Sequence, residues 1–403
     1  MASVAEEAAH SVFSFIERAA ERVADGVRWQ TLDWHNQPHF TPAIFTGMGG
    51  VSFFLADYYR LTGNGIALEL ARGGLEWCAS PAREPERDSE WEWASNGLMR
   101  GRSGLGKAWL SLHRASGDAS HLERAAALGD QVMAVQAGPV TDWQDGAAGE
   151  GLFLLWLAEA SRDDRFLRGA TQRAAWLEEV VIMDEGGAYW PWQTDHDEHA
   201  RWFGLSFVPG SAGIAHFLLS LFQHTQDGRW ATLSRAAGET LLRQAVPDRD
   251  GLNWPDTLDG FTHGEERRCQ WCYGASGTAL FFTKAHETLG SRDRDYLGTA
   301  VAAGECTYAY GDVRRNPSQC HGLAGSVELF LDLHRLTQDV RWLDRAAEFA
   351  KLMLSYRERT SQGDVWQSDD SGYSSPDFLY GVSGTGHTFL RLWRPDLLTR
   401  PLL

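Results

Sequence analysis

The sequence contains few cysteines and no long hydrophobic run. Five cysteines scattered over 403 residues do not form a disulfide framework, so packing, metal binding or reactivity must explain each one. No apolar run approaches the roughly 20 residues of a membrane span. The N-terminal segment has the pattern of an amphipathic helix over residues 5–25 and lacks that of a signal peptide. We therefore expect a cytoplasmic protein with no membrane span.

Basic residues are also scarce. Lys and Arg total 37 against 54 Asp and Glu, and the net charge of −17 is not concentrated in an acidic tail. Such a surface repels phosphate backbones, so we expect no nucleic acid partner. The 43% hydrophobic share is typical of a globular protein and excludes global disorder. Because no Pro- or Ser-rich linker interrupts the chain, we expect a single domain over residues 1–403.

Glycine, by contrast, is abundant, with 42 residues. A helical protein should avoid it, since glycine costs about 1 kcal/mol relative to alanine inside a helix. The excess follows a pattern, because seven GxxG motifs each open an almost wholly apolar run typical of a helix inside a large fold. The motifs are Gly47–Gly50, Gly101–Gly104, Gly146–Gly149, Gly210–Gly213, Gly274–Gly277, Gly322–Gly325 and Gly381–Gly384.

The first six apolar runs end in short polar turns that supply N-cap chemistry for a following amphipathic helix. These turns are Thr62–Asn64, Ser116–Asp118, Ser161–Asp163, Thr225–Asp227, Ser291–Asp293 and Thr337–Asp339. The seventh run has no following partner, and the unpaired N-terminal helix can fill that place. Seven helix pairs at a mean spacing of about 58 residues (403/7) predict an all-α (α/α)7 toroid of seven outer and seven inner helices.

The residue before each GxxG motif is expected to face the centre of the ring, so differences there can carry function. Only the fifth and sixth units add cysteines nearby, in Trp271-Cys272-Tyr273-Gly274 and Cys320-His321-Gly322. Two thiols and one imidazole at adjacent helix starts form a three-ligand zinc set, since a helix N-terminus favours the thiolate. A catalytic zinc keeps its fourth position open for water or substrate.

Other interpretations of these cysteines stay open. Cys269 lies three residues before Cys272, so CxxC followed by CH is also compatible with a closed structural site of four protein ligands. Against it, the Cys272–Cys320 separation spans a whole helical pair, unlike the compact spacing of a zinc knuckle. Buried, inert cysteines are a further alternative. Cys78 and Cys306 fall on outer helices and are expected in the core.

With seven GxxG-led helices, WCYG in the fifth unit and CHG in the sixth, the sequence resembles the LanC family of lanthionine synthetase C and LanC-like cyclases over essentially its whole length. The resemblance implies a zinc ion held by Cys272, Cys320 and His321. It also implies a Michael-type addition of a cysteine thiol to dehydroalanine or dehydrobutyrine, which forms the thioether rings of lanthipeptides such as lantibiotics.

Three more residues stand at positions that match functional residues of the family. The resemblance implies that Asp142 is an active-site acid and that Arg268 lies near the metal, where it can steady an enolate oxygen. Capping and salt-bridge roles are the alternatives for these two. Tyr273 follows the cysteine as in the family, but Tyr380 occupies the same place in the seventh unit, which has no ligands. An architectural role is therefore the strong alternative for Tyr273.

One position departs from the family pattern. Typical cyclases have a histidine just before the fourth GxxG, proposed as an acid or base, where this chain has Pro209, which cannot transfer a proton. Another group or water then protonates the enolate, or the chemistry differs. His263, nine residues before Cys272, is a candidate that can reach the site from a loop, and an exposed loop histidine is the alternative. His216 and His387 lie further along inner helices and are expected to be core histidines.

Nine of the 18 tryptophans lie in the segments that lead from an outer helix to the next GxxG motif. They either pack these segments onto the ring or form an aromatic, acidic rim that holds an extended peptide. The nine are Trp29, Trp34, Trp91, Trp93, Trp143, Trp190, Trp192, Trp254 and Trp366.

We therefore expect a zinc-dependent peptide cyclase that acts on a dehydrated precursor peptide, with dehydration performed by separate enzymes. One alternative is a LanC-like enzyme that joins a small thiol such as glutathione to dehydroamino acids, which Pro209 favours. Another is a non-catalytic, zinc-stabilised peptide-binding scaffold, favoured if Cys269 completes the coordination. A helical-toroid glycosidase would need paired central carboxylates and would not explain the WC and CH pair.

Overall fold

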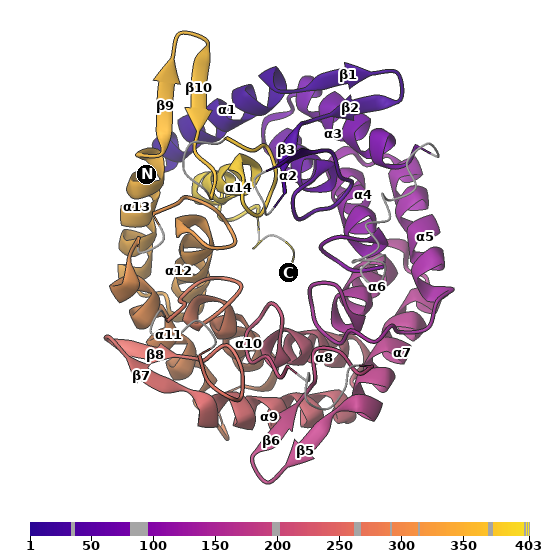
Figure 1. The fold of residues 1–403 in the computed structure, drawn as a ribbon, viewed down its shortest axis with the longest axis vertical. Helices are drawn as coiled ribbons and strands as arrows, with labels where there is room; N and C mark the ends of the chain where they lie inside the picture. Colours follow the sequence, from indigo (N-terminus) through magenta and orange to yellow (C-terminus); the bar gives the residue numbers. More distant parts are fainter. Residues whose placement is uncertain are drawn as a thin grey trace.

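In the computed structural model, the described part of the chain forms fourteen helices in two concentric rings (Figure 1). The structure describes residues 1–33, 37–80, 96–195, 202–261, 267–290, 292–312, 315–369 and 374–398, together with Arg400 and Leu402. The all-α double-layered toroid predicted from the GxxG repeat is therefore confirmed.

The inner ring consists of the seven helices that follow the GxxG motifs. They are α2 (Met48–Thr62), α4 (Arg102–Ser116), α6 (Ala147–Ser161), α8 (Ser211–Thr225), α10 (Ala275–Leu289), α12 (Leu323–Thr337) and α14 (Val382–Trp393). The outer ring consists of α1 (Ala2–Arg18), α3 (Gly65–Cys78), α5 (Ala119–Met133), α7 (Asp164–Val180), α9 (Gly228–Gln244), α11 (Tyr296–Tyr310) and α13 (Arg341–Leu354).

The ring is closed by contacts between the two ends of the chain. Helix α14 packs against α2 and α12, and α1 packs along α14 as the seventh outer helix, as predicted. The predicted end of α1 near residue 25 was wrong, because the helix ends at Arg18. Strand β1 (Glu21–Val23) then pairs antiparallel with β2 (Gly26–Arg28). Gly26 permits this turn with φ at +141°.

Asparagine and aspartate cap the outer helices, as the polar turns predicted. Asn64, Asp118, Asp163 and Asp227 each accept a hydrogen bond from a backbone N–H in the first turn of the following helix. The fifth turn differs, because Asp295 and not Asp293 caps α11.

Short β-hairpins follow four outer helices and were not predicted. Besides β1–β2, they are β5 (Ile182–Asp184) with β6 (Gly187–Tyr189), β7 (Val246–Asp248) with β8 (Gly251–Asn253), and β9 (Arg357–Thr360) with β10 (Gly363–Trp366). A further small pair, β3 (Thr31–Leu32) with β4 (Pro38–His39), lies before α2.

A buried tryptophan ends or directly follows each of these four hairpins. The indole N–H groups of Trp29, Trp190 and Trp254 donate to the backbone carbonyls of Ile16, Leu177 and Leu241 at 2.7–2.8 Å. Trp366 is equally buried. These four tryptophans therefore pack the hairpins onto the outer ring and do not belong to a peptide-binding rim. Trp34, Trp91 and Trp93 lie outside the described residues.

Glycine is required where an inner helix starts against its neighbouring loop. A Cβ atom at Gly277 would overlap the carbonyl oxygen of Trp271, and Gly274 has φ at +86°. These two glycines let the Cys272 loop turn tightly onto the first residues of α10.

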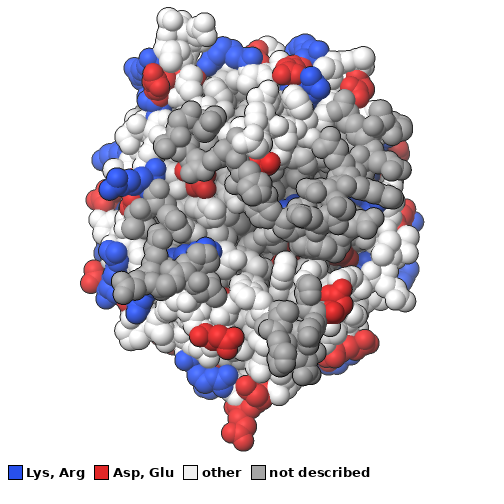
Figure 2. Space-filling view, viewed as in Figure 1, with Lys and Arg blue, Asp and Glu red and all other residues white. Residues whose placement is uncertain are grey.

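No helix in the described ranges is long and apolar enough to cross a membrane. On the face drawn in Figure 2, the described Lys, Arg, Asp and Glu side chains alternate around the outer edge.

Candidate metal centre

The starts of α10 and α12 bring two cysteines and one histidine together. The ligand atoms of Cys272, Cys320 and His321 all lie within 4.8 Å of one another. Both cysteines are buried and His321 is half-buried. The backbone holds both loops in place, since the Cys320 N–H donates to the Leu379 carbonyl at 3.0 Å and the Val208 N–H donates to the Cys272 carbonyl at 3.1 Å.

Protons are unevenly shared within this cluster. Burial opposes ionisation of Cys272, but the hydrogen bond from Cys320 and the charge of His321 lower its pKa to about 5. Burial, together with the neighbouring Cys272 thiolate, raises the pKa of Cys320 well above its ordinary value. Although burial acts the other way, the Cys272 charge and a bond to Asp369 raise the pKa of His321 to about 10. Without metal, these shifts favour a Cys272 thiolate beside a protonated His321.

This donor set fits zinc. Two thiolates and a neutral imidazole are typical zinc ligands, and the three atoms converge from neighbouring helix starts. A cation bound by the three residues would displace the protons of Cys320 and His321.

Cys269 lies outside this cluster. Its thiol faces α11, where it lies 3.6 Å from the Thr307 hydroxyl and forms a hydrogen-bonded pair with Cys306. The geometry therefore does not supply Cys269 as a fourth ligand. Cys78 and Cys306 are buried on outer helices, as expected.

Arg268 and Tyr273 lie on the same loop as Cys272. The Arg268 guanidinium stacks over the Tyr273 ring at 4.5 Å, and its charge helps to lower the pKa of Cys272. Burial, followed by the nearby Cys272 thiolate, raises the pKa of Tyr273. Both residues thus lie beside the cluster, and their catalytic roles stay predictions.

Asp142 lies on the loop before α6 and divides its two oxygens between two tasks. One oxygen accepts the backbone N–H groups of Asp145 and Gly146 at 2.8 and 3.1 Å, which is a capping role. The other accepts the indole N–H of Trp192 at 2.8 Å. Burial, followed by the charge of Asp145, raises the pKa of Asp142 to about 6. A carboxyl group with this pKa can exchange a proton near neutral pH.

The described histidines of the inner helices α8 and α14 are not brought to the cluster. Pro209 follows Val208, whose backbone contacts the Cys272 loop, and has no titratable group. His263 lies outside the described residues. His216 is buried against Phe207, and His387 is buried and bonds to Asp57 at 3.1 Å. Neither His216 nor His387 therefore takes the place of the family's acid or base.

Two neighbours of His321 were not predicted from the sequence. The carboxylate of Asp369 lies 2.7 Å from His321 Nδ1, and the Tyr380 ring lies 5.1 Å from the imidazole between centroids. Both residues belong to the seventh unit, whose place beside the sixth is set by tertiary packing. Nothing in the spacing of the sequence connects Asp369 to His321.

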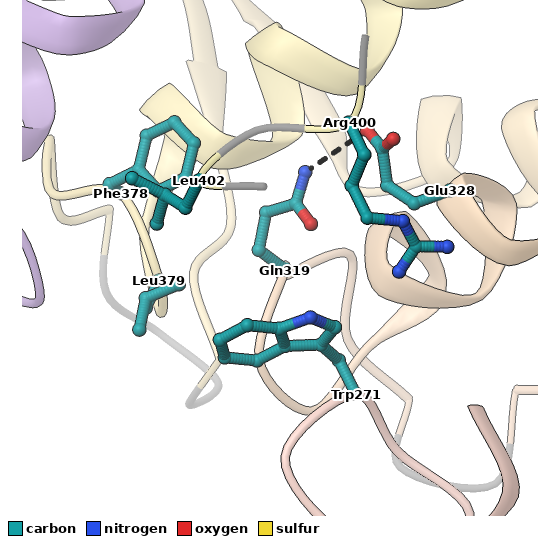
Figure 3. A pocket seen from close by; sticks show the side chains of 7 residues that line it. All are labelled: Trp271, Gln319, Glu328, Phe378, Leu379, Arg400 and Leu402. Atoms are coloured by element: carbon teal, nitrogen blue, oxygen red, sulfur yellow. Dashed lines mark hydrogen bonds between the residues drawn. The ribbon is translucent and has the colours of Figure 1, made fainter. Parts of the chain in front are cut away.

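A small cavity lies beside the loops that carry Cys272 and Cys320 (Figure 3). Trp271 and Gln319, which directly precede Cys272 and Cys320, line it together with Arg400 and Leu402. Gln319 donates to Glu328 at 3.4 Å, and Arg400 donates to Asp332 at 2.8 Å. Arg400 and Leu402, which follow α14, therefore line this cavity together with residues of the two ligand loops.

The fold and the cluster define a class of protein, the double-layered helical toroids with a thiol–imidazole centre at the inner helix starts. The chain belongs to the lanthionine synthetase C-like protein family, whose family model matches residues 40–403.

Named relatives agree with this membership. The chain is 26% identical to LanC-like protein GCL1 of Arabidopsis thaliana over 332 residues, covering 78% of this chain and 71% of that protein. It is 35% identical to Glutathione S-transferase LANCL1 of Danio rerio over 159 residues, 39% of this chain and 37% of that protein.

Solved structures share the fold. Nisin cyclase superposes with a TM-score of 0.65 at 17% identity, covering 98% of this chain and 95% of that one. A GH76 α-mannanase of Bacteroides thetaiotaomicron superposes with a TM-score of 0.55 at 11% identity, covering 97% and 96%. At these identities, both similarities show the toroid alone.

Proposed function

We propose that the protein is a zinc-dependent cyclase that forms thioether rings in a dehydrated, ribosomally made precursor peptide. The observation that carries the proposal is the convergence of Cys272, Cys320 and His321 within 4.8 Å at two adjacent helix starts of a LanC-like chain. The position of Cys269 against α11 supports an open, catalytic centre over a closed scaffold.

The proposed reaction adds a substrate thiol across a carbon–carbon double bond. The sulfur forms a bond to the β-carbon of dehydroalanine or dehydrobutyrine, the electron pair of the double bond moves into the adjacent carbonyl as an enolate, and the α-carbon then receives a proton. Zinc, when bound, would promote loss of the thiol proton at neutral pH.

The chain's own residues would serve the remaining needs. The Arg268 guanidinium lies close enough to influence Cys272, so its positive charge can stabilise an enolate oxygen beside the cluster. Asp142, whose buried carboxyl group has a pKa of about 6, would return the proton near neutral pH. Tyr273 would hold the Arg268 guanidinium through its ring.

Two observations favour a second candidate, the addition of a small thiol such as glutathione to dehydroamino-acid residues. Pro209 removes the family's usual proton-transfer histidine, and a relative that is 35% identical over 159 residues is named a glutathione S-transferase. The bonds formed and broken are the same, but the thiol comes from solution instead of the peptide.

Metal analysis tests the centre first. Purified protein is expected to contain about one zinc per chain, and Cys320→Ala is expected to lose most of it. Cys78→Ala, which removes a buried thiol on α3, serves as the matched control and should retain the metal. A wild-type protein without zinc, or equal zinc in both variants, contradicts the proposal.

A peptide that carries one cysteine and one dehydroalanine then separates the two activities. Cyclisation leaves the peptide mass unchanged and removes the thiol that iodoacetamide alkylates, whereas glutathione addition raises the mass and leaves that thiol free. If neither product forms with zinc-loaded protein and either thiol source, both catalytic proposals fail.

A further inference from the structure

Asp369 reaches the cluster from a different unit of the ring than the three candidate ligands. It follows strand β10, and its backbone N–H donates to the Tyr380 carbonyl at 2.9 Å, which ties it to the start of α14. Its side chain crosses to the sixth unit, where Oδ2 lies 2.7 Å from Nδ1 of His321.

The carboxylate is itself held in position. Oδ1 of Asp369 accepts a hydrogen bond from the Ser318 hydroxyl at 3.3 Å, and the same hydroxyl oxygen accepts the backbone N–H of His321 at 3.3 Å. Ser318, Asp369 and His321 therefore form one connected network. The Tyr380 ring packs beside the imidazole at an interplanar angle of 32°, which limits its rotation.

This arrangement distinguishes the two nitrogens of the imidazole. Nδ1 is engaged by Asp369, so Nε2 is the nitrogen left for the cysteines, and the imidazole does hydrogen-bond to Cys272. A carboxylate only accepts, so the proton of a neutral imidazole must lie on Nδ1. The lone pair then lies on Nε2, which faces the thiols.

We propose that Asp369 is a positioning residue that fixes the tautomer and the orientation of His321, so that Nε2 is presented to a divalent metal held with Cys272 and Cys320. The inference rests on the zinc centre of the proposed function. It adds that the seventh unit, which supplies no ligand, controls the affinity of the site. The negative charge of Asp369 also makes Nε2 of the imidazole a stronger electron-pair donor to the metal and favours a bound cation.

Zinc affinity tests this role independently of turnover. Competition with a chromophoric chelator is expected to show zinc binding about 10- to 100-fold weaker in Asp369→Ala than in the wild type. Asp369→Asn should lose less, because its amide oxygen still accepts the Nδ1–H bond. This rescue by the conservative variant separates orientation from a general loss of structure.

Asp364→Ala is the matched control. Asp364 lies on β10, five residues before Asp369, and its side chain is 23% exposed against 21% for Asp369. Its carboxylate also accepts a hydrogen bond, in this case from the Ser11 hydroxyl at 2.7 Å. Its removal should leave zinc affinity unchanged. The visible spectrum of cobalt-substituted protein should shift in Asp369→Ala and not in Asp364→Ala, because only the former alters the imidazole ligand.

The outcomes separate this inference from the proposed function. A wild-type protein that binds no zinc overturns both. A wild type that binds zinc, with equal affinity in Asp369→Ala and Asp364→Ala, overturns the role of Asp369 and leaves the zinc centre standing. Should Asp369→Ala not fold, Ser318→Ala removes one support of the carboxylate and must still weaken zinc binding, or the inference is wrong.

Discussion

Replacing Asp142 with asparagine is expected to stabilise the protein at pH 7 and to abolish the proposed activity. The carboxyl group is buried, and its pKa rises from 3.8 to about 6, first through burial and then through the charge of Asp145. The hydrogen bonds from the Asp145 N–H and the Trp192 indole, and then the charge of Arg100, oppose this rise. The folded state therefore holds the Asp142 proton more tightly than the unfolded chain does. The resulting stability is complete below about pH 3.8 and is lost as the pH rises towards 6.

The magnitude follows from the size of the shift. One pKa unit equals about 1.4 kcal/mol, so ionised Asp142 costs the folded state about 3 kcal/mol at pH 7. Asparagine carries no charge and avoids this cost. Its amide oxygen can still accept the N–H groups of Asp145 and Gly146, but its NH2 group cannot accept the Trp192 indole N–H, which costs about 1 kcal/mol at any pH. The net gain at pH 7 is about 2 kcal/mol.

Urea unfolding of metal-free protein at pH 4 and pH 7 measures this gain. We compare the free energy of unfolding of Asp142→Asn with that of the wild type at each pH. The difference, variant minus wild type, should be larger by about 2 to 3 kcal/mol at pH 7 than at pH 4. Asp377→Asn is the matched control, because burial raises the pKa of Asp377 to about 6 and it caps α14 in the same way. It should show the same pH dependence and retain activity. A difference independent of pH, or a less stable Asp142→Asn protein at pH 7, would refute the reasoning.

Two further outcomes are expected. Cys269→Ala should retain its zinc while Cys272→Ala loses it, because the Cys269 thiol faces Thr307 and Cys306; equal metal loss in atomic absorption measurements would place Cys269 in the coordination shell. Arg173→Met should lower the free energy of unfolding by about 3 to 5 kcal/mol, since it leaves Glu150 buried without its 2.6 Å partner. The double variant with Glu150→Gln should recover much of that loss, and no recovery in urea unfolding would contradict a charge-based cause.

The sequence predicted the ring because its signals are local. Each inner helix begins at a GxxG motif and each of four outer helices at the expected Asn or Asp cap, so chain order alone fixed their positions. The β-hairpins could not be predicted, because strands of three or four residues are too short for an alternating pattern. The sequence shows that tryptophans recur in these segments. Only the structure shows that the indoles of Trp29 and Trp254 donate hydrogen bonds to the preceding outer helices.

Only those parts of the site that stand at equivalent positions of the repeat could be predicted from the sequence. Cys272, Cys320 and His321 stand at helix starts that the repeat itself aligns, so their convergence follows from the architecture. The role of Asp369 could not be predicted, because its contact with His321 joins two units across 48 residues. The direction in which Cys269 points was also unpredictable, because it depends on whether a thiol three residues before the ligand turns inward or towards α11.

Asp142 and Asp377 show what distinguishes a functional position from an architectural one in such a ring. Both lie four residues before the first glycine of a GxxG motif, and in both one oxygen accepts the same two backbone N–H groups. Motif position therefore explains the cap, and burial explains the raised pKa of both carboxyl groups. The difference lies in the second oxygen, which meets the Trp192 indole in one unit and the Ser375 hydroxyl in the other. A catalytic role for Asp142 must consequently come from what its own loop faces, and not from its pKa alone.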